Sequence, residues 1–302
     1  NRNFPDPIQD GEDLPLGREP ETQVMMQFGA QHRFVLGANY HGGAQVMNYP
    51  WDGWTSSEVR PPDEAEFIAF CTGYAQRNDD IWNDPDPARI IQGADWYRVY
   101  GGLQDWSYYW HSEQHVTIEV SSVKAPPYSQ MNTFWDHNRD AMIWWLGRAL
   151  VGARGLVTDA QTGQPVDAKV WVVREDDIPA LTDPSVGDYH RLLMPGTYTL
   201  RAEAFCYQPQ TVQVVVADGA ATVHNFALQP AEQHSLQGVI TDVMSGEPLA
   251  AQIALVGTEY LAESDPLTGQ FALDVCDGTY EVRVDAPYYR QQTRTVTVIG
   301  GM

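Results

Sequence analysis

Residues 116–121 read VTIEVS, in which apolar and polar side chains alternate. Side chains of a strand point alternately to its two faces, so this stretch predicts a strand with three apolar side chains on a buried face and Glu119 on the polar face. Residues 34–38, FVLGA, form a short continuous apolar run, which is typical of a strand buried on both faces. These two stretches predict the sheet of a layered domain.

Helix signals lie on either side of these strands. Residues 20–28 open with Pro and Glu before an apolar stretch, which predicts a short helix. At residues 61–64, PPDE starts a second helix, and its apolar side chains share one face. They are Phe67, Phe70, Cys71 and Tyr74. Thr133 and Asp136 have the spacing of a capping box and predict the start of a third helix. Helices interleaved with strands predict an α/β layer fold for residues 1–150.

After residue 150 the helical periodicity disappears, and short β-branched runs alternate with Gly, Pro and Asp turns. GLVTD at residues 155–159 matches GVITD at 238–242, 83 residues later. PGTYTLR at residues 195–201 matches DGTYEVR at 277–283, 82 residues later. A nearly constant offset predicts two copies of one small β-sandwich. The expected domains are residues 1–150, 151–231 and 232–302.

Composition narrows the class of partner. The chain of 302 residues carries 18 Lys and Arg against 40 Asp and Glu, a formal net charge of −22. Such a surface argues against nucleic acid and anionic membranes and favours cationic partners, unless the charge serves only solubility. No apolar run approaches the ~20 residues of a membrane-spanning helix. Three widely spaced cysteines exclude a thiolate-rich metal site and a dense disulfide framework.

Two side chains stand out chemically. His41 follows the strand predicted at residues 34–38 and precedes two glycines, a position that suits either a metal ligand or a structural histidine. Glu119 lies on the polar face of an otherwise apolar strand. A carboxylate there is either hydrogen-bonded structure or a general base. The residues alone leave both choices open.

These segments together resemble the M14 zinc carboxypeptidases, in particular the regulatory branch of carboxypeptidases N, E, M and D. The motifs that carry the resemblance occur in the same order as in that family. They are NRNFPD at residues 1–6, NYHGGA at 39–44, NYPWD at 48–52, DWYRVYGGLQDW at 95–106 and TIEVS at 117–121. The resemblance extends to the first β-sandwich, because this branch carries a transthyretin-like domain directly after the catalytic domain.

The resemblance implies a catalytic role for two residues. His41 matches a zinc ligand, and Glu119 matches the general base that takes a proton from the zinc-bound water. The implied cofactor is Zn²⁺, which polarises a peptide carbonyl and lowers the pKa of its bound water. The implied function is a zinc-dependent metallocarboxypeptidase that is secreted or extracellular.

Five further residues match substrate-binding positions of the family. Asn1 and Arg2 match the pair that holds the substrate's terminal carboxylate, for which the planar guanidinium is well suited. Tyr97 matches the tyrosine that closes over the bound C-terminus. Asp52 and Gln104 match the pocket that accepts a C-terminal Lys or Arg. The expected partners are therefore C-termini of peptides or proteins, preferably basic ones, and not nucleic acid.

The same positions have plainer structural interpretations. Asp52 could cap the turn that follows it, which is a common task for aspartate. Tyr97 could pack against neighbouring side chains. Asp105 and Trp106 are expected in the core, and the histidines at 111, 115 and 137 on the surface or in hydrogen bonds.

One family motif is missing. The family binds zinc through an HxxE motif, and none of the eight histidines here has a Glu three residues later. Because a catalytic zinc normally takes three protein ligands, His41 alone cannot hold it. We therefore expect an incomplete catalytic domain that lacks its N-terminal part and is inactive alone. The alternative is a catalytically silent peptide-binding or adhesive protein built on a degenerate peptidase fold.

Overall fold

The computed structural model describes residues 2–84, 89–174, 178–258 and 260–300. The chain divides into two compact units. The first comprises residues 1–203 and 209–228, and the second comprises residues 204–208 and 229–302. The part of the chain that carries the predicted catalytic residues lies in the first unit.

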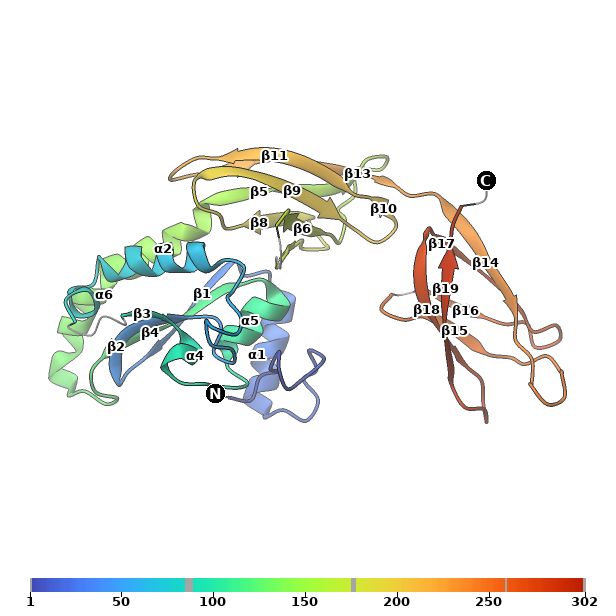
Figure 1. Ribbon diagram of the computed structural model, residues 1–302, viewed down its shortest axis with the longest axis horizontal. Coiled ribbons are helices and arrows are strands. Elements are labelled where there is room, and N and C mark those ends of the chain that lie inside the picture. Colours follow the sequence, from blue (N-terminus) through green and yellow to red (C-terminus); the bar gives the residue numbers. More distant parts are fainter. Residues whose placement is uncertain (1, 85–88, 175–177, 259, 301–302) are drawn as a thin grey trace. The chain divides into compact units, whose positions relative to one another are not determined.

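A mixed four-stranded sheet forms the centre of the α/β part, in the order β1-β4-β2-β3 (Figure 1). Its strands are β1 (Leu36–His41), β2 (Ala44–Tyr49), β3 (Ile90–Gln92) and β4 (Gln114–Ser121). Strand β4 runs parallel to β1 and antiparallel to β2, while β3 runs parallel to β2. This register sets His41 opposite Glu119 at the carboxyl ends of β1 and β4.

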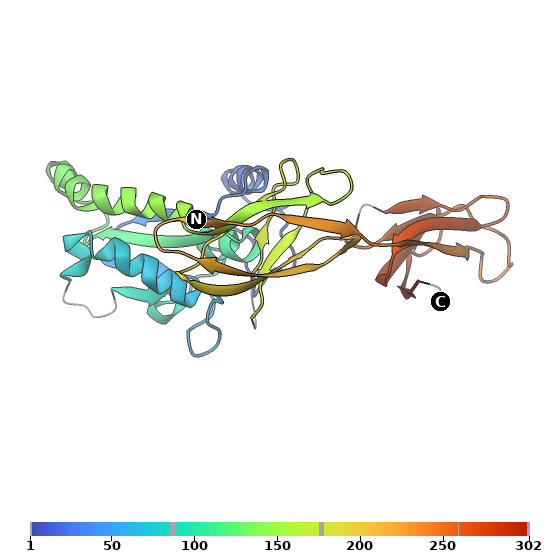
Figure 2. The same ribbon diagram turned by 90° about the horizontal axis from the view of Figure 1, so that it is seen from above.

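Helices cover both faces of this sheet (Figures 1 and 2). They are α1 (Pro20–Gln31), α2 (Glu64–Ala75), α3 (Asp79–Trp82), α4 (Gly93–Trp96), α5 (Leu103–His111) and α6 (Met131–Gly147), with 3₁₀ turns at Tyr128–Gln130 and Arg148–Leu150. Helices α2 and α6 lie on one face, and α1, α4 and α5 on the other. The predicted apolar face of α2 is confirmed, because Phe67, Phe70, Cys71 and Tyr74 are all buried in the main core.

Two local predictions were wrong. The strand predicted at residues 34–38 begins only at Leu36 and is partly exposed, because β1 pairs with β4 alone among the described strands and so leaves one edge open. The predicted capping box does not open α6, which starts at Met131. A 3₁₀ turn begins directly after Pro127 and runs into the helix, so the helix is already formed when the chain reaches Thr133.

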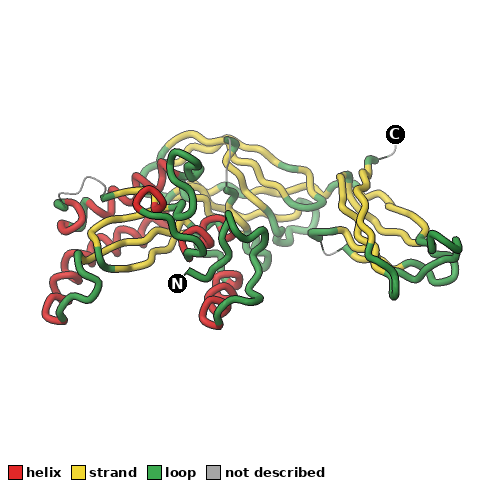
Figure 3. The backbone as a smooth tube through the Cα atoms, turned by 60° about the horizontal axis from the view of Figure 1, so that its bottom comes forward, coloured by secondary structure: helices red, strands yellow, loops and turns green. Residues whose placement is uncertain are grey.

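After α6 and the 3₁₀ turn at Arg148–Leu150, the described chain contains only strands and loops (Figure 3). The first sandwich has one sheet ordered β10-β13-β5-β12, with β8 also paired to β5, and a second ordered β11-β9-β6-β7. Its strands are β5 (Gly152–Asp159), β6 (Lys169–Val172), β7 (Ala180–Leu181), β8 (Asp188–Arg191), β9 (Gly196–Glu203), β10 (Tyr207–Gln208), β11 (Gln210–Val216), β12 (Ala221–Val223) and β13 (Phe226–Pro230). This fold agrees with the all-β prediction for this part of the chain.

The second sandwich pairs β14 with β17 and orders its other sheet β16-β15-β18-β19. Its strands are β14 (Gln233–Val239), β15 (Gln252–Leu255), β16 (Leu261–Glu263), β17 (Gln270–Cys276), β18 (Gly278–Asp285) and β19 (Gln292–Val298). Details of the repeat recur in three dimensions. The Tyr198 hydroxyl donates to the carbonyl of Met194, and the Tyr280 hydroxyl donates to the carbonyl of Cys276.

A disulfide joins Cys206 to Cys276, both in the second unit. The two cysteines lie 70 positions apart, and the sequence gave no indication that they pair. Cys71, on α2, is a free thiol and is buried in the main core. No helix in the described ranges is long and apolar enough to cross a membrane.

Candidate active site

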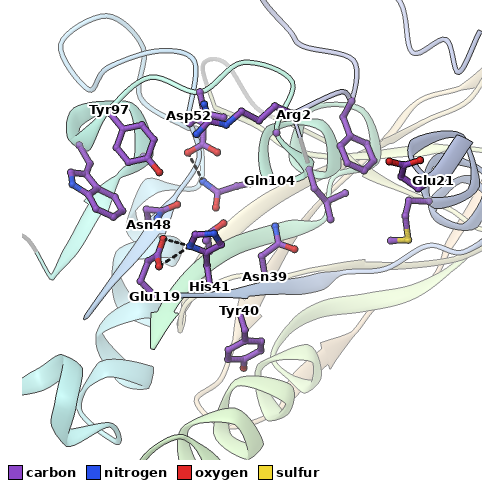
Figure 4. A pocket seen from close by; sticks show the side chains of 18 residues that line it. Arg2, Glu21, Asn39, Tyr40, His41, Asn48, Asp52, Tyr97, Gln104 and Glu119 are labelled. Carbon is purple, nitrogen blue, oxygen red and sulfur yellow. Dashed lines mark hydrogen bonds and ion pairs between the residues drawn. The ribbon is translucent and has the colours of Figure 1, made fainter. Parts of the chain in front are cut away.

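A cavity of about 430 Å³ opens beyond the carboxyl ends of β1 and β4. Its wall gathers six of the seven residues predicted for the site from sequence (Figure 4). They are Arg2, His41, Asp52, Tyr97, Gln104 and Glu119. The seventh, Asn1, lies outside the described residues. Segments up to 117 residues apart in sequence therefore meet in one hollow of the first unit.

His41 and Glu119 form one pair in this cavity. The Nδ1 atom of His41 lies 2.9 Å and 3.0 Å from the two carboxylate oxygens of Glu119. The Glu119 side chain is buried, whereas 57% of the His41 side chain is exposed. When Nδ1 carries the proton, it donates to Glu119 and leaves Nε2 with a free lone pair. The carboxylate thus orients an imidazole that stays accessible to a ligand.

Asp52 forms a buried acidic floor. It comes three residues after β2, is 9% exposed, and its Oδ1 accepts a hydrogen bond from Gln104 Nε2 at 3.1 Å. Two glycines make room for the carboxylate: a Cβ on Gly93 would lie 1.8 Å from Oδ1, and one on Gly102 would lie 3.2 Å from Oδ2. The carboxylate fits here only because both neighbours lack side chains.

Asp105 holds the backbone of this floor. Its carboxylate accepts hydrogen bonds from the amides of Asp52, at 2.8 and 2.9 Å, and Gly53, at 3.0 Å. The sequence predicted that Asp105 lies in the core, and it is 1% exposed. Its bonds to the pocket backbone were missed, because a buried acid at the start of a helix gives no signal about a loop 52 residues earlier.

Electrostatics distinguish this floor from ordinary surface acids. Burial raises the pKa of Asp52 to about 7, against the attraction of Arg2 and with the repulsion of Asp6. Burial also raises the pKa of Asp105 well above its ordinary value, and the nearby Asp52 adds to the effect. Within the described residues, no Lys, Arg or His forms an ion pair with Asp52. A cation that entered the pocket would favour the ionised form of this carboxyl group.

Arg2 and Tyr97 lie on the cavity wall near this floor (Figure 4). The guanidinium carbon of Arg2 is 6.0 Å from the centroid of the Tyr97 ring. Tyr97 follows α4, is 47% exposed and contacts the Trp96 ring edge-on. The packing alternative for Tyr97 is thus partly correct, since it touches Trp96 while still facing the cavity.

The donors at His41 and Glu119 are too few, among the described side chains, for a catalytic zinc ion. A catalytic zinc takes three protein ligands and keeps one position open. Among the residues that the structure describes, no group of three or more His, Cys, Asp or Glu side chains is arranged to hold a metal. His41 and Glu119 supply two donors and already bond to each other. These residues by themselves do not make a zinc centre.

Comparison with known proteins assigns two parts of the chain to protein families. Residues 1–141 match the zinc carboxypeptidase family model, and residues 152–229 match the carboxypeptidase regulatory-like domain model. The first part of the chain therefore belongs to the zinc carboxypeptidase family, followed by a regulatory-like domain at the place predicted for the first sandwich.

Three relatives illustrate the match. Carboxypeptidase D of Mus musculus is 33% identical over 79% of this chain and 18% of its own length. Carboxypeptidase SOL1 of Arabidopsis thaliana is 35% identical over 76% of this chain and 48% of its own length. The carboxypeptidase N catalytic chain of Mus musculus is 35% identical over 70% of this chain and 49% of its own length. The chain thus spans about half the length of these relatives, or less.

Proposed function

We propose that this chain is part of a zinc-dependent metallocarboxypeptidase that removes C-terminal Lys or Arg from peptides or proteins. The observation that carries the proposal is Asp52, a buried carboxylate that faces a cavity and forms no ion pair with a described side chain, although Arg2 on the same wall attracts it. A buried unpaired charge is costly, so the pocket is most stable when a ligand brings a cation into it.

Gln104 adds a second reason to expect a cationic side chain. Its Nε2 donates to Asp52, while its buried Oε1 has no hydrogen-bond partner in the described structure. The pocket floor thus holds a carboxylate and a buried amide oxygen without a partner, which are both acceptors. A guanidinium or ammonium group carries several donors and no acceptor, and so complements this wall. A neutral or acidic side chain would leave the acceptors without partners.

The remaining predicted residues would orient the substrate backbone. Arg2 brings a guanidinium to the cavity wall, where it would bind the terminal carboxylate together with Asn1. Tyr97, exposed and close to Arg2, would cover the bound C-terminus. Such contacts select a chain end over an internal segment, because only the chain end carries a free carboxylate.

His41 and Glu119 would contribute one zinc ligand and the general base. Since the described residues offer no set of three ligands, the other ligands would have to come from polypeptide outside this sequence. We therefore expect the 302-residue chain to bind basic C-termini without hydrolysing them. Incubation with Zn²⁺ and a short peptide ending in Arg tests this expectation: release of Arg by this chain alone would contradict it.

A second candidate is a peptide-binding protein without catalysis. The lack of three metal ligands in the described chain favours it, and the paired His41 and Glu119 favour the enzyme. The discriminating experiment measures zinc content and Arg release after polypeptide that supplies further His and Glu ligands is added. Stoichiometric zinc with turnover supports the enzyme, and binding without either supports the silent binder.

Substrate class can be tested by binding. Peptides of one sequence ending in Arg, Lys, Phe or Glu are titrated into the chain by calorimetry. We expect Arg and Lys to bind at least tenfold more tightly than Phe or Glu, and Asp52→Asn to remove that preference. Glu21→Gln is a matched control, since Glu21 is an exposed acid at another point of the same cavity wall. Equal affinity for all four peptides would exclude a basic-residue pocket.

We further propose that the protein functions in the secretory pathway or outside the cell. The Cys206–Cys276 disulfide supports this, because disulfides persist in oxidising compartments. The net charge of −22 supports basic peptides rather than nucleic acid as partners.

A further inference from the structure

Charged and polar groups from the α/β part and from the first sandwich meet at the buried carboxylate of Asp63, which directly precedes α2. Arg191, at the end of β8, donates to both oxygens of Asp63, at 2.7 and 3.0 Å. Arg174 of the same sandwich also donates to Oδ1. From the other side, the Tyr108 hydroxyl of α5 donates to Oδ2 at 2.8 Å. One carboxylate therefore links the sandwich to a helix of the α/β part.

The sandwich supplies the charge that this carboxylate needs. Asp63 is fully buried and Arg191 is 2% exposed. Burial alone would raise the pKa of Asp63, but the charges of Arg191 and Arg174 outweigh burial and keep the pKa below its ordinary value. The ionised form accepts the Tyr108 hydroxyl in a charge-assisted hydrogen bond, which is stronger than a neutral one.

Tyr108 leads from this cluster to the candidate pocket. It is fully buried on α5 and lies four residues after Gln104, so the two side chains occupy the same face of the helix on successive turns. The Tyr108 ring also packs on Trp51, with ring centroids 5.1 Å apart, and Trp51 directly precedes Asp52. Gln104 thus lies one helical turn from Tyr108, and Asp52 follows a residue whose ring packs on Tyr108.

We infer that Arg191 of the regulatory-like domain is a positioning residue for the pocket. Arg191 pairs with Asp63, and Asp63 in turn holds the Tyr108 hydroxyl. A fixed Tyr108 holds both the turn of α5 that carries Gln104 and the segment that carries Asp52. The inference rests on the proposed function for the chemical class of the ligand. The sandwich then does more than dock beside the peptidase fold, because its charge determines how tightly the pocket floor is held.

The first test needs no ligand. Tyr108→Phe removes one hydroxyl and keeps the ring and the Arg191–Asp63 pair, so the variant is expected to fold. Amide hydrogen exchange of the full chain should become about tenfold faster at Asp52 and Gly53. The reason is that the hydrogen bond from Tyr108 to Asp63 is lost, and with it the restraint that Tyr108 places on the segment of Trp51 and Asp52. Tyr189→Phe is the matched control: its hydroxyl donates to the carbonyl of His224 within the sandwich. Unchanged exchange at Asp52 and Gly53 in Tyr108→Phe would overturn the inference.

The second test measures selectivity. Affinities for peptides ending in Arg and in Phe are compared in the wild-type chain, Tyr108→Phe and Arg191→Met. If Arg191 is a positioning residue, the preference for the Arg-ended over the Phe-ended peptide should fall about tenfold in both Tyr108→Phe and Arg191→Met. Tyr189→Phe should leave this preference unchanged. A merely structural role lowers stability and leaves the ratio as it was, which would contradict the inference. If the wild-type chain shows no preference for Arg, the proposed function fails, while the exchange experiment still decides the role of Tyr108.

Discussion

Asp52 and Asp63 are two buried aspartates only eleven positions apart, yet their surroundings are opposite. Asp63 accepts hydrogen bonds from Arg191, Arg174 and Tyr108, and the two cations keep its pKa below the ordinary value. Asp52 accepts one from Gln104, lies near a second buried acid, and has its pKa raised to about 7 by burial. The fold bonds two cations directly to Asp63, whereas Asp52 feels only the attraction of Arg2, which does not offset its burial.

This difference separates a structural group from a binding group. A buried carboxylate with built-in cations stabilises the fold only while those cations remain. A buried carboxylate that faces a cavity without them weakens the empty protein and gains stability when a cationic ligand enters. Asp52 lines a cavity, whereas Asp63 is fully buried among its bonding partners, and this contrast assigns the two roles.

The largest effect should come from removing a built-in cation. Arg191→Met leaves Asp63 with reduced compensation, and we expect the first unit to lose about 3–5 kcal/mol of stability. All ten Trp lie in that unit, so Trp fluorescence during denaturant unfolding reports on it. Arg201→Met is the control, because Arg201 pairs with Glu203 at the surface and should cost less than about 1 kcal/mol. Similar losses of stability in Arg191→Met and Arg201→Met would show that the buried pair with Asp63 matters no more than a surface ion pair.

Replacing the other aspartate should have the opposite sign. Asp52 has a pKa of about 7 in the folded chain and about 3.9 when unfolded. Its contribution to stability is therefore complete below about pH 4 and is lost as the pH rises through 7. Asp52→Asn does not titrate and so avoids this loss. The stability of the variant relative to the wild type should therefore increase by about 2–4 kcal/mol as the pH is raised from 4 to 8. A stability difference that does not change with pH would contradict the assignment.

Crowding the pocket floor tests its geometry. Gly93→Ala places a Cβ 1.8 Å from Asp52 Oδ1, so the carboxylate has to move. We expect a loss of about 1–3 kcal/mol in stability and weaker binding of Arg-ended peptides. Gly147→Ala, at the end of α6, meets no atom within 4 Å and should change neither quantity appreciably. Calorimetry and denaturant unfolding of both variants give the two readouts.

The smallest effect concerns pH and binding. A cationic ligand needs the ionised form of Asp52, so affinity for an Arg-ended peptide should fall about tenfold per pH unit below pH 7. Binding near pH 7 should also release a proton, which calorimetry detects in buffers of different ionisation enthalpy. Asp52→Asn should bind with no such pH dependence, and a wild-type affinity that is flat from pH 5 to 8 would show that Asp52 does not meet the cation.

Local patterns predicted much of the α/β part. The apolar face of α2 and the strand β4 are set by side chains within a few positions of one another, and both are present in the structure, although Glu119 and Ser121 on the predicted polar face of β4 are buried as well. The exposure of β1 depends on whether a second strand pairs with its outer edge, and the residues of β1 do not determine this. The start of α6 depends on a turn after Pro127 rather than on the spacing of Thr133 and Asp136.

By itself, the sequence determined the order of motifs and the repeat after residue 150, because these are properties of residue type and spacing, and the family resemblance of those motifs predicted the candidate residues of the site. Only the tertiary structure decided that Arg191 neutralises Asp63, 128 positions away, and that Asp52 lacks such a cation. Aspartate has the same intrinsic chemistry at both positions. Burial and the charges that folding brings near it decide what each carboxylate does.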